Sequence, residues 1–252
     1  MKAIIISIGD ELLIGNTLNT NAHWLGIELT QLGIQIKATW TIPDEKSEII
    51  YYIKQAQNQA EIILITGGLG PTNDDLTVDA IAAYYQEELI YHNDIWENIK
   101  SMYTSRNREI HEPSIKLAYL PKSATPIFNT QGTAPGSLYL SENTLMASMP
   151  GVPYEMKKMM ELTVIPAIKK KFSLPFIVNK YFYTAGVGET ILSDALTNFE
   201  KNIPENFSLA YLPSVGKVRL RLTGRGNDLN KLKQTAENLS KEIQEAIDKY
   251  IY

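Results

Sequence analysis

The stretch TGGLGPTNDDLT combines backbone freedom with negative charge, and this combination could serve phosphate chemistry. Gly67, Gly68 and Gly70 permit conformations that other residues avoid, and they leave peptide N–H groups open to a ligand. Such N–H groups at the start of a helix favour an anion. Asp74 and Asp75 would repel that anion. A divalent cation that bridges carboxylate and phosphate oxygens would resolve the conflict.

A purely structural interpretation of the same stretch stays open. Asp74 or Asp75 could cap the helix that follows, and the glycines could simply shape a turn. Known nucleotide-binding patterns do not decide the matter. No Gly-Lys-Ser/Thr follows as in a Walker loop, and the GxGxxG pattern is missing.

Three other stretches contain groups that could join this site: GDELLIGNTLNTN, NTQGTAPG and MPGVPYEM. Asp10 and Glu11 could act as metal ligands or bases, although ordinary solvated loop acids explain them better on spacing alone. Asn19 and Asn21 suit a helix cap or a hydrogen bond to a ligand. The MPGVP segment could turn the chain into a helix or offer free N–H groups to a phosphate.

The hydrophobic pattern predicts the elements that would bring these stretches together. Buried strands are expected at 2–8, 34–42 and 61–66, and helices at 19–33, 44–60 and from 75 onward. This alternation is typical of a doubly wound α/β domain. Ligands of such domains bind beyond the carboxyl ends of the strands. GDELLIGNTLNTN, GGLGPTNDD and MPGVPYEM each follow a predicted strand and so fall there, and NTQGTAPG could lie near the same edge.

The second half of the chain predicts the rest of this domain and a smaller one. Residues 92–120 look mostly helical, ATPIFN and TLMASMP read as strands, and a long helix begins at GVPYEM. The pattern pauses at 173–175, so we divide the chain into domains 1–172 and 176–252. The second is expected to be a small α+β unit, with strand, helix, strand pair and helix at 177–185, 190–202, 207–223 and 228–249.

Composition limits the classes of function. The chain is 44% hydrophobic with a net charge of −4, which gives no electrostatic reason to expect a nucleic acid or an anionic membrane as partner. The absence of cysteine excludes disulfides and thiolate chemistry. The first apolar run is short and lacks a cleavage site, and no run approaches the ~20 residues of a membrane span. A cytoplasmic protein is therefore expected.

The motifs GDELLIG, NTN, TGGLGPTNDDLT, NTQGTAPG and MPGVPYEM resemble, in the same order, those of the competence/damage-inducible protein A (CinA) family. To about residue 170 the chain is similar to that family's molybdopterin-binding-like domain, a three-layer α/β/α fold with a mostly parallel sheet. The tail, with AYLPSVGKVRLRLTGRG, resembles its small α+β KH-like domain. Many members continue into a domain that deamidates nicotinamide mononucleotide. The sequence ends at Tyr252, so we do not carry that activity over.

The resemblance implies a metal-dependent nucleotide pyrophosphatase that hydrolyses a phosphoanhydride bond of ADP-ribose or a related dinucleotide. Asp75, with Asp74, would hold Mg²⁺, Mn²⁺ or Co²⁺, and Asp10 or Glu11 would assist; a monovalent cation is a further candidate. The residues expected to hold the nucleotide and its phosphates are Gly67, Gly68, Leu69, Gly70, Thr72, Thr77, Asn19, Asn21, Gly132, Thr133, Gly136, Pro150 and Gly151.

Two alternatives belong to other classes of function. The domain could be a molybdopterin-binding module of molybdenum cofactor metabolism, or a degenerate domain that only assembles with partners. The intact acid pair counts against the second. The expected partner is a nucleotide-type small molecule, without nucleic acid or membrane, because residues 176–252 contain no GxxG loop for RNA. A homodimer is expected, since the apolar tail AIDKYIY could pack on a neighbouring chain.

Overall fold

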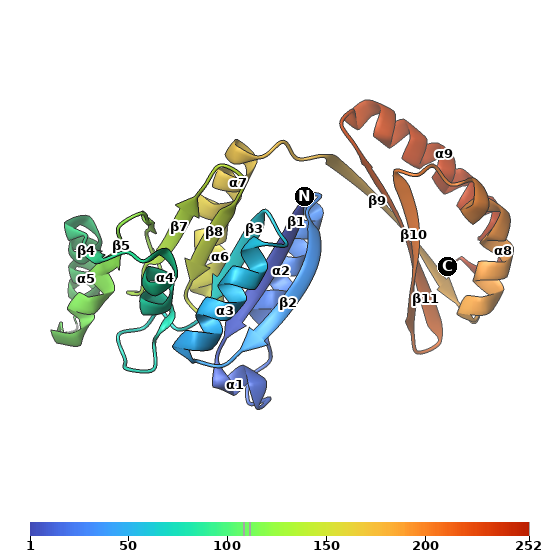
Figure 1. Ribbon diagram of the computed structural model, residues 1–252. Coiled ribbons are helices and arrows are strands. Elements are labelled where there is room, and N and C mark those ends of the chain that lie inside the picture. Colours follow the sequence, from blue (N-terminus) through green and yellow to red (C-terminus); the bar gives the residue numbers. More distant parts are fainter. Residues whose placement is uncertain (108, 111, 252) are drawn as a thin grey trace. The chain divides into compact units, whose positions relative to one another are not determined.

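In a computed structural model, which describes residues 1–107, 109–110 and 112–251, the chain forms two compact units (Figure 1). The larger unit comprises residues 1–30 and 34–173, and the smaller comprises 31–33 and 174–252. The larger unit contains every stretch that the sequence analysis singles out for ligand binding, so the site must be built from its elements.

A six-stranded sheet forms the centre of the larger unit, in the order β2-β1-β3-β8-β7-β6. The strands are β1 (Lys2–Ile8), β2 (Gln35–Ile42), β3 (Ile62–Thr66), β6 (Thr125–Ile127), β7 (Gly136–Leu140) and β8 (Leu145–Met149). Strands β2, β1, β3 and β8 are mutually parallel, whereas β7 runs antiparallel to β8 and β6. The predicted mostly parallel sheet is confirmed.

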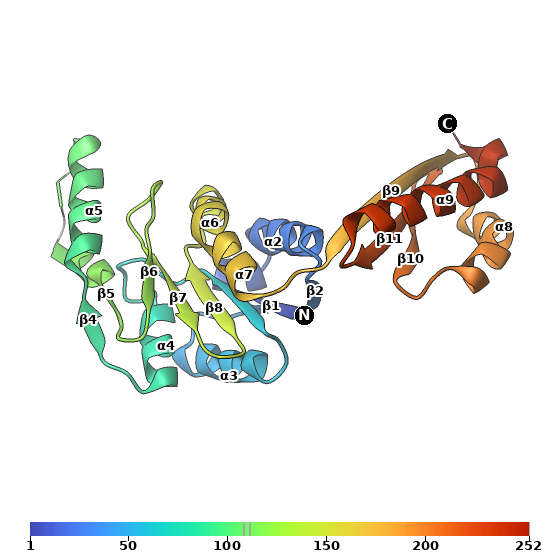
Figure 2. The same cartoon turned by 90° about the horizontal axis from the view of Figure 1, so that it is seen from above.

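Helices cover both faces of this sheet (Figure 2). On one side lie α3 (Lys46–Gln57) and α4 (Thr77–Tyr85); on the other lie α2 (Thr20–Gln31), α6 (Pro153–Met159) and α7 (Ile165–Lys171). Successive side chains of a strand point to opposite faces. Ile4 and Ile6 accordingly join the core cluster that includes Ile49 of α3 and Ile81 of α4. The predicted three-layer α/β/α fold is confirmed.

Part of the larger unit differs from the pattern expected from sequence. GDELLIG, taken as a loop, contains the short helix α1 (Asp10–Leu13). The segment expected to be mostly helical holds α5 (Asn93–Ser105) and a 3-10 helix (Glu112–Ala118), but β4 (Leu89–Tyr91) and β5 (Tyr119–Pro121) pair around it. A π-helical turn (Met160–Val164) joins α6 to α7.

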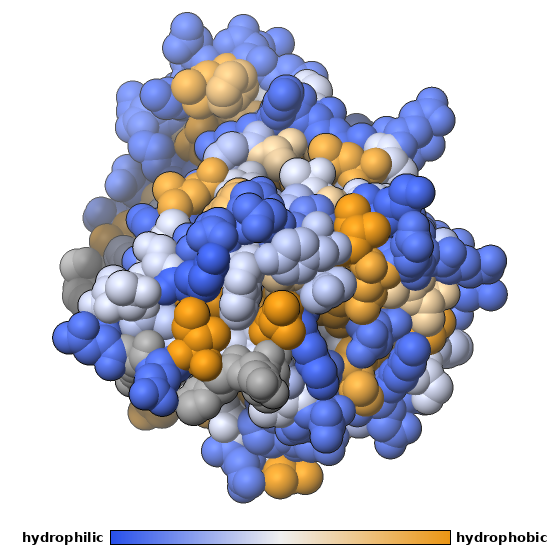
Figure 3. Space-filling view, turned by 90° about the vertical axis from the view of Figure 1, so that its left-hand side faces the viewer, coloured by the Kyte–Doolittle hydropathy of each residue, from blue (hydrophilic) through white to orange (hydrophobic). Residues whose placement is uncertain are grey.

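In the view toward the left-hand side of Figure 1, apolar side chains lie in separate groups among hydrophilic ones (Figure 3).

The smaller unit is an antiparallel sheet with two helices. Its strands β9 (Phe176–Ala185), β10 (Phe207–Ser214) and β11 (Lys217–Gly226) follow the order β10-β11-β9. Helices α8 (Glu189–Asn202) and α9 (Leu229–Ile247) complete its own hydrophobic core. The predicted small α+β unit is confirmed. Across the described residues, no helix is both long enough and apolar enough to cross a membrane.

The end of the chain packs on the smaller unit itself. After a 3-10 turn (Asp248–Tyr250), Tyr250 lies against the core of this unit and Ile251 forms a β-bridge with Thr184. Tyr252 lies outside the described residues. The tail is therefore engaged within its own chain, which removes the reason for expecting it to pack on a neighbour. The homodimer stays a prediction without that support.

Candidate functional site

The loops that follow three parallel strands meet in one cleft. Because β1, β3 and β8 are parallel, their carboxyl ends lie at the same edge of the sheet, and the antiparallel β7 starts there. The cleft has a volume of about 490 Å³. Its lining residues are Ile8, Gly9, Glu11, Asp44, Gly67, Gly68, Leu69, Gly70, Pro71, Asp74, Asp75, Thr133, Ala134, Pro150, Gly151, Val152 and Glu155.

The glycines after β3 are required by the path of the backbone. Gly67 and Gly68 have φ values of 105° and 63°, in the region that favours glycine. A Cβ atom on Gly67 would lie 2.2 Å from the carbonyl oxygen of Ile8, so the loop passes directly over the end of β1. The Gly67 N–H donates to the Met149 carbonyl at 3.0 Å, which fixes the loop to β8.

Thr77 holds this loop in place through two hydrogen bonds. Its side chain is buried, and its hydroxyl donates to the Gly67 carbonyl at 2.9 Å. Its N–H donates to the Gly68 carbonyl at 3.1 Å. Thr77 is predicted from the sequence to hydrogen-bond a ligand, but both of its donors bind the glycine backbone.

Asp75 closes the loop on itself. Its Oδ1 accepts from the Gly70 N–H at 2.7 Å, and its Oδ2 accepts from the Thr72 N–H at 3.0 Å and from the Thr72 hydroxyl at 2.5 Å. Helix α4 begins at Thr77 with Leu76 at the N-cap, so Asp75 does not cap the helix. Three donors already satisfy the carboxylate that was expected to hold a metal.

The predicted metal ligands do not form a preformed cation site. Asp74 is exposed, and no described group of three or more His, Asp or Glu side chains is arranged to hold a metal ion. A divalent cation normally takes several oxygen ligands from the protein or its substrate. Metal binding at Asp74 and Asp75 stays a prediction.

Asp44 is a carboxylate of the cleft that the sequence analysis does not identify. Its Oδ2 accepts a hydrogen bond from the Asp10 N–H at 3.0 Å, which ties the segment after β2 to the start of α1. Burial raises the pKa of Asp44, and repulsion from Asp10, Glu11 and Asp75 adds to the rise, against the lowering effect of the Asp10 N–H. Glu11 lines the cleft with it, whereas Asp10 does not.

Asn129 and Glu155 form a buried polar pair that shapes the loop before β7. The Asn129 side-chain amide donates to Glu155 Oε2 at 2.7 Å and to the Ala134 carbonyl at 2.9 Å. Its Oδ1 accepts from the N–H groups of Gln131 and Gly132 at 3.0 and 2.8 Å. A Cβ atom on Gly132 would lie 2.3 Å from the Glu155 carboxylate, which explains the glycine. Neither Asn129 nor Glu155 is among the residues predicted from the sequence.

Asn19 and Asn21, expected as helix caps or ligand donors, differ from each other: Asn19 caps α2, and Asn21 holds a loop. Asn19 Oδ1 accepts from the Ala22 N–H at 3.0 Å, as a residue capping α2 does. Asn21 Nδ2 donates to the Gly151 carbonyl at 2.7 Å and so holds the loop after β8. Its Oδ1 is buried without a partner among the described residues. Neither asparagine lines the cleft.

The remaining predicted residues divide between lining and packing. Thr133, Pro150 and Gly151 line the cleft as expected. Gly136 is a packing position, since a Cβ atom there would lie 2.6 Å from the Ser148 carbonyl oxygen on β8. Thr72 lies outside this cleft and lines a second cavity.

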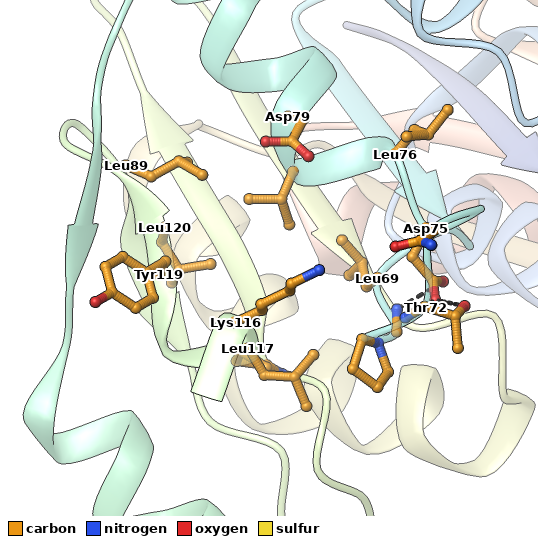
Figure 4. A pocket seen from close by; sticks show the side chains of 15 residues that line it. Leu69, Thr72, Asp75, Leu76, Asp79, Leu89, Lys116, Leu117, Tyr119 and Leu120 are labelled. Carbon is orange, nitrogen blue, oxygen red and sulfur yellow. Dashed lines mark hydrogen bonds between the residues drawn. The ribbon is translucent and has the colours of Figure 1, made fainter. Parts of the chain in front are cut away.

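The second cavity, of about 320 Å³, borders the same loop (Figure 4). It shares Leu69, Gly70, Pro71 and Asp75 with the cleft. Val78 of α4, Leu89 of β4 and Leu120 of β5 give it an apolar lining, and the Lys116 side chain reaches into it. Within the described part of the chain, Lys116 is the only lysine or arginine that lines either cavity. Lys116 is not among the residues predicted from the sequence.

Comparisons with known proteins cover both units. The family model for a "Probable molybdopterin binding domain" matches residues 4–170, and that for the "Damage-inducible protein CinA KH domain" matches 179–252. A CinA-like protein of Flavobacterium psychrophilum is 40% identical over 92% of this chain and 56% of its own length. A CinA-like protein of Cytophaga hutchinsonii is 35% identical over 99% of this chain and 60% of its own length. The chain thus spans little more than half the length of these relatives.

A solved structure agrees with the fold of the larger unit. The crystal structure of CinA from Thermoplasma acidophilum, described as of unknown function, shares 32% identity and a TM-score of 0.60. The match covers 67% of this chain and 96% of the chain in that crystal structure. The match to a molybdopterin binding domain overturns the main functional prediction. A pyrophosphatase acting on ADP-ribose is the wrong interpretation, and the alternative, a molybdopterin-binding module, fits better.

Proposed function

The chain belongs to the CinA-like protein family, and from that premise we propose that its larger unit binds a molybdopterin-type pterin in the cleft beyond β1, β3 and β8. One observation carries the proposal: residues from four stretches that are far apart in the sequence, GDELLIG, TGGLGPTNDDLT, NTQGTAPG and MPGVPYEM, line a single cleft. Its volume of about 490 Å³ lies within the range of small-molecule sites.

The residues of the cleft fit the two chemical parts of such a ligand. A pterin ring is rich in N–H donors, and the described lining includes the carboxylates of Glu11, Asp44 and Glu155 but no lysine or arginine. Molybdopterin also carries a phosphate, which these carboxylates would repel. Lys116 in the neighbouring cavity supplies the attraction that the cleft lacks. We therefore expect the ring in the cleft and the phosphate directed toward Lys116.

Equilibrium titration tests the proposal. A 6-substituted pterin carrying a phosphomonoester is titrated into the full chain, and binding is followed by pterin fluorescence. Saturable binding with one ligand per chain is expected. Gly151→Leu should abolish it, because the new side chain enters the cleft while its Cβ meets only ordinary contact, 3.5 Å from the Gly67 Cα.

Gly26→Leu is the matched control. Gly26 lies on α2, and a Cβ atom there has nothing within 4 Å, so this variant should bind as the wild type does. Absence of saturable binding to the folded wild type up to millimolar ligand would overturn the proposal. Unchanged binding by folded Gly151→Leu would show that the ligand lies elsewhere.

A further inference from the structure

We propose that the Glu155 carboxylate recognises the aminopyrimidine edge of the pterin, through the acceptor positions that its hydrogen bond with Asn129 leaves free. This inference rests on the proposed function. It goes further by naming the residue that selects the ring and the edge of the ring that it selects.

The surroundings of Glu155 are unusual for a buried charge. Its side chain belongs to a residue only 8% exposed, yet it lines the cleft. Oε2 accepts one hydrogen bond, from Asn129 at 2.7 Å. Within the described part of the chain Oε1 accepts none, and no lysine, arginine or histidine pairs with the carboxylate. One neutral amide is therefore the whole of its compensation.

Such a carboxylate has acceptor positions without hydrogen-bond donors. An ionised carboxylate has about four acceptor positions, and burying its charge is unfavourable unless donors compensate it. The Glu155 carboxylate packs against the Gly132 backbone, and the residue also lines the cleft. A ligand that brings N–H donors into the cleft would complete the set. A ligand that brings an acceptor to the same place would be rejected.

A pterin carries the matching donors side by side. Its 2-amino group and its N3–H point in the same direction, and a carboxylate accepts such a pair much as it accepts the paired N–H groups of arginine. Lumazine is the same ring system with a carbonyl in place of the 2-amino group. Its ring edge alternates donors and acceptors, so one carbonyl oxygen would face the Glu155 carboxylate. The pair pterin and lumazine therefore isolates the proposed contact.

A purely structural role for Glu155 makes a different prediction. If the Glu155 carboxylate only anchors Asn129 and the loop before β7, its replacement would change the affinities for pterin and lumazine by the same factor. Glu155→Gln separates the two roles. Glutamine keeps an acceptor for the Asn129 amide, so the loop should persist, but it presents an N–H₂ donor and no charge to the cleft.

The experiment measures the affinities of wild type and Glu155→Gln for a pterin and a lumazine that carry the same 6-substituent. We expect the wild type to prefer the pterin by at least about tenfold, the loss typical of one hydrogen bond to a charged group. In Glu155→Gln this preference should disappear or reverse. Gly26→Leu is again the control: it should leave both affinities and their ratio unchanged.

Two results would overturn the inference. If folded Glu155→Gln keeps the wild-type preference for pterin over lumazine, Glu155 does not read the ring, although the proposed function stands. If the wild type binds neither ligand, the proposed function fails and takes this inference with it. Glu155→Asp provides a second test should the glutamine variant not fold. It keeps the charge but withdraws it by one methylene, so the preference should fall.

Discussion

Asp75 stabilises its own loop, because both oxygens of its carboxylate accept hydrogen bonds from Gly70 and Thr72. Asp75→Asn removes the charge and replaces one acceptor with a donor. We expect this variant to lower the free energy of unfolding by about 1–2 kcal/mol, because it weakens the hydrogen bonds that Gly70 and Thr72 donate to a charged carboxylate. Urea denaturation measures this loss. Asp74→Asn is the matched control, because this side chain is exposed and its variant should unfold at the same urea concentration as the wild type. Equal stability of the two variants would contradict this role.

Asp44 should make stability depend on pH. Burial and the neighbouring acids raise its pKa in the folded chain above the ordinary value of 3.8. The folded state then binds more protons than the unfolded state in this window, so stability falls as pH rises through the folded pKa. Asp44→Asn removes this term and can still accept from the Asp10 N–H.

We therefore expect Asp44→Asn to be more stable than the wild type at pH 7, by less than about 1 kcal/mol because the residue is partly exposed. The advantage should vanish below the unfolded pKa. Denaturation curves across pH 3–8, on the order of one per pH unit, would show this. An advantage that grows toward acid pH would refute it.

The residues missed from the sequence were missed for two physical reasons. Asp44 follows β2 at the same edge as the other loops, so the rule that ligands bind beyond parallel strands could have found it. Asn129 and Glu155 are 26 residues apart, and their contact exists only after β7, β8 and α6 have packed. Both residues lie in stretches that stand out in the sequence, NTQGTAPG and MPGVPYEM, but nothing in the local pattern marks their pairing.

At the scale of elements, the turn between β3 and α4 depends on Gly67. An alanine there must adopt a φ of 105° and place its Cβ 2.2 Å from the Ile8 carbonyl oxygen. Gly67→Ala should therefore cost about 3 kcal/mol or more, as strain and overpacking add. Gly15→Ala isolates the first effect, because Gly15 has a φ of 77° with nothing within 4 Å. It should cost about 1–2 kcal/mol. Equal losses in thermal unfolding experiments would contradict the close approach.

Long elements with a strong hydrophobic period were predictable, and short ones were not. The isoleucine runs of β1 and β3 are buried on both faces, so their sequence reads directly as parallel strands. Strands β4 and β5 have three residues each and are stabilised by each other across an intervening helix. Their pairing is a tertiary contact, which no local period encodes. The π-helical turn after α6 likewise left no mark in the pattern.

At the scale of the whole molecule, the larger unit should fold by itself. Helices from residues within 1–173 cover both faces of its sheet, and the smaller unit has a separate core. A chain truncated after Ser173 should show one cooperative thermal transition and bind the phosphorylated pterin as the full chain does. A broad, non-cooperative transition would show that the larger unit needs the rest of the chain.

Hydrogen exchange with and without the phosphorylated pterin tests the central claim most directly, because it reports where the ligand lies on the intact chain. We predict slower amide exchange in three segments that are distant in sequence but border one cleft: 67–75, 129–136 and 150–155. Amides of the smaller unit should exchange at unchanged rates. Saturated ligand that protects none of these segments, or protects only residues outside the larger unit, would contradict the assignment of the cleft as a pterin site.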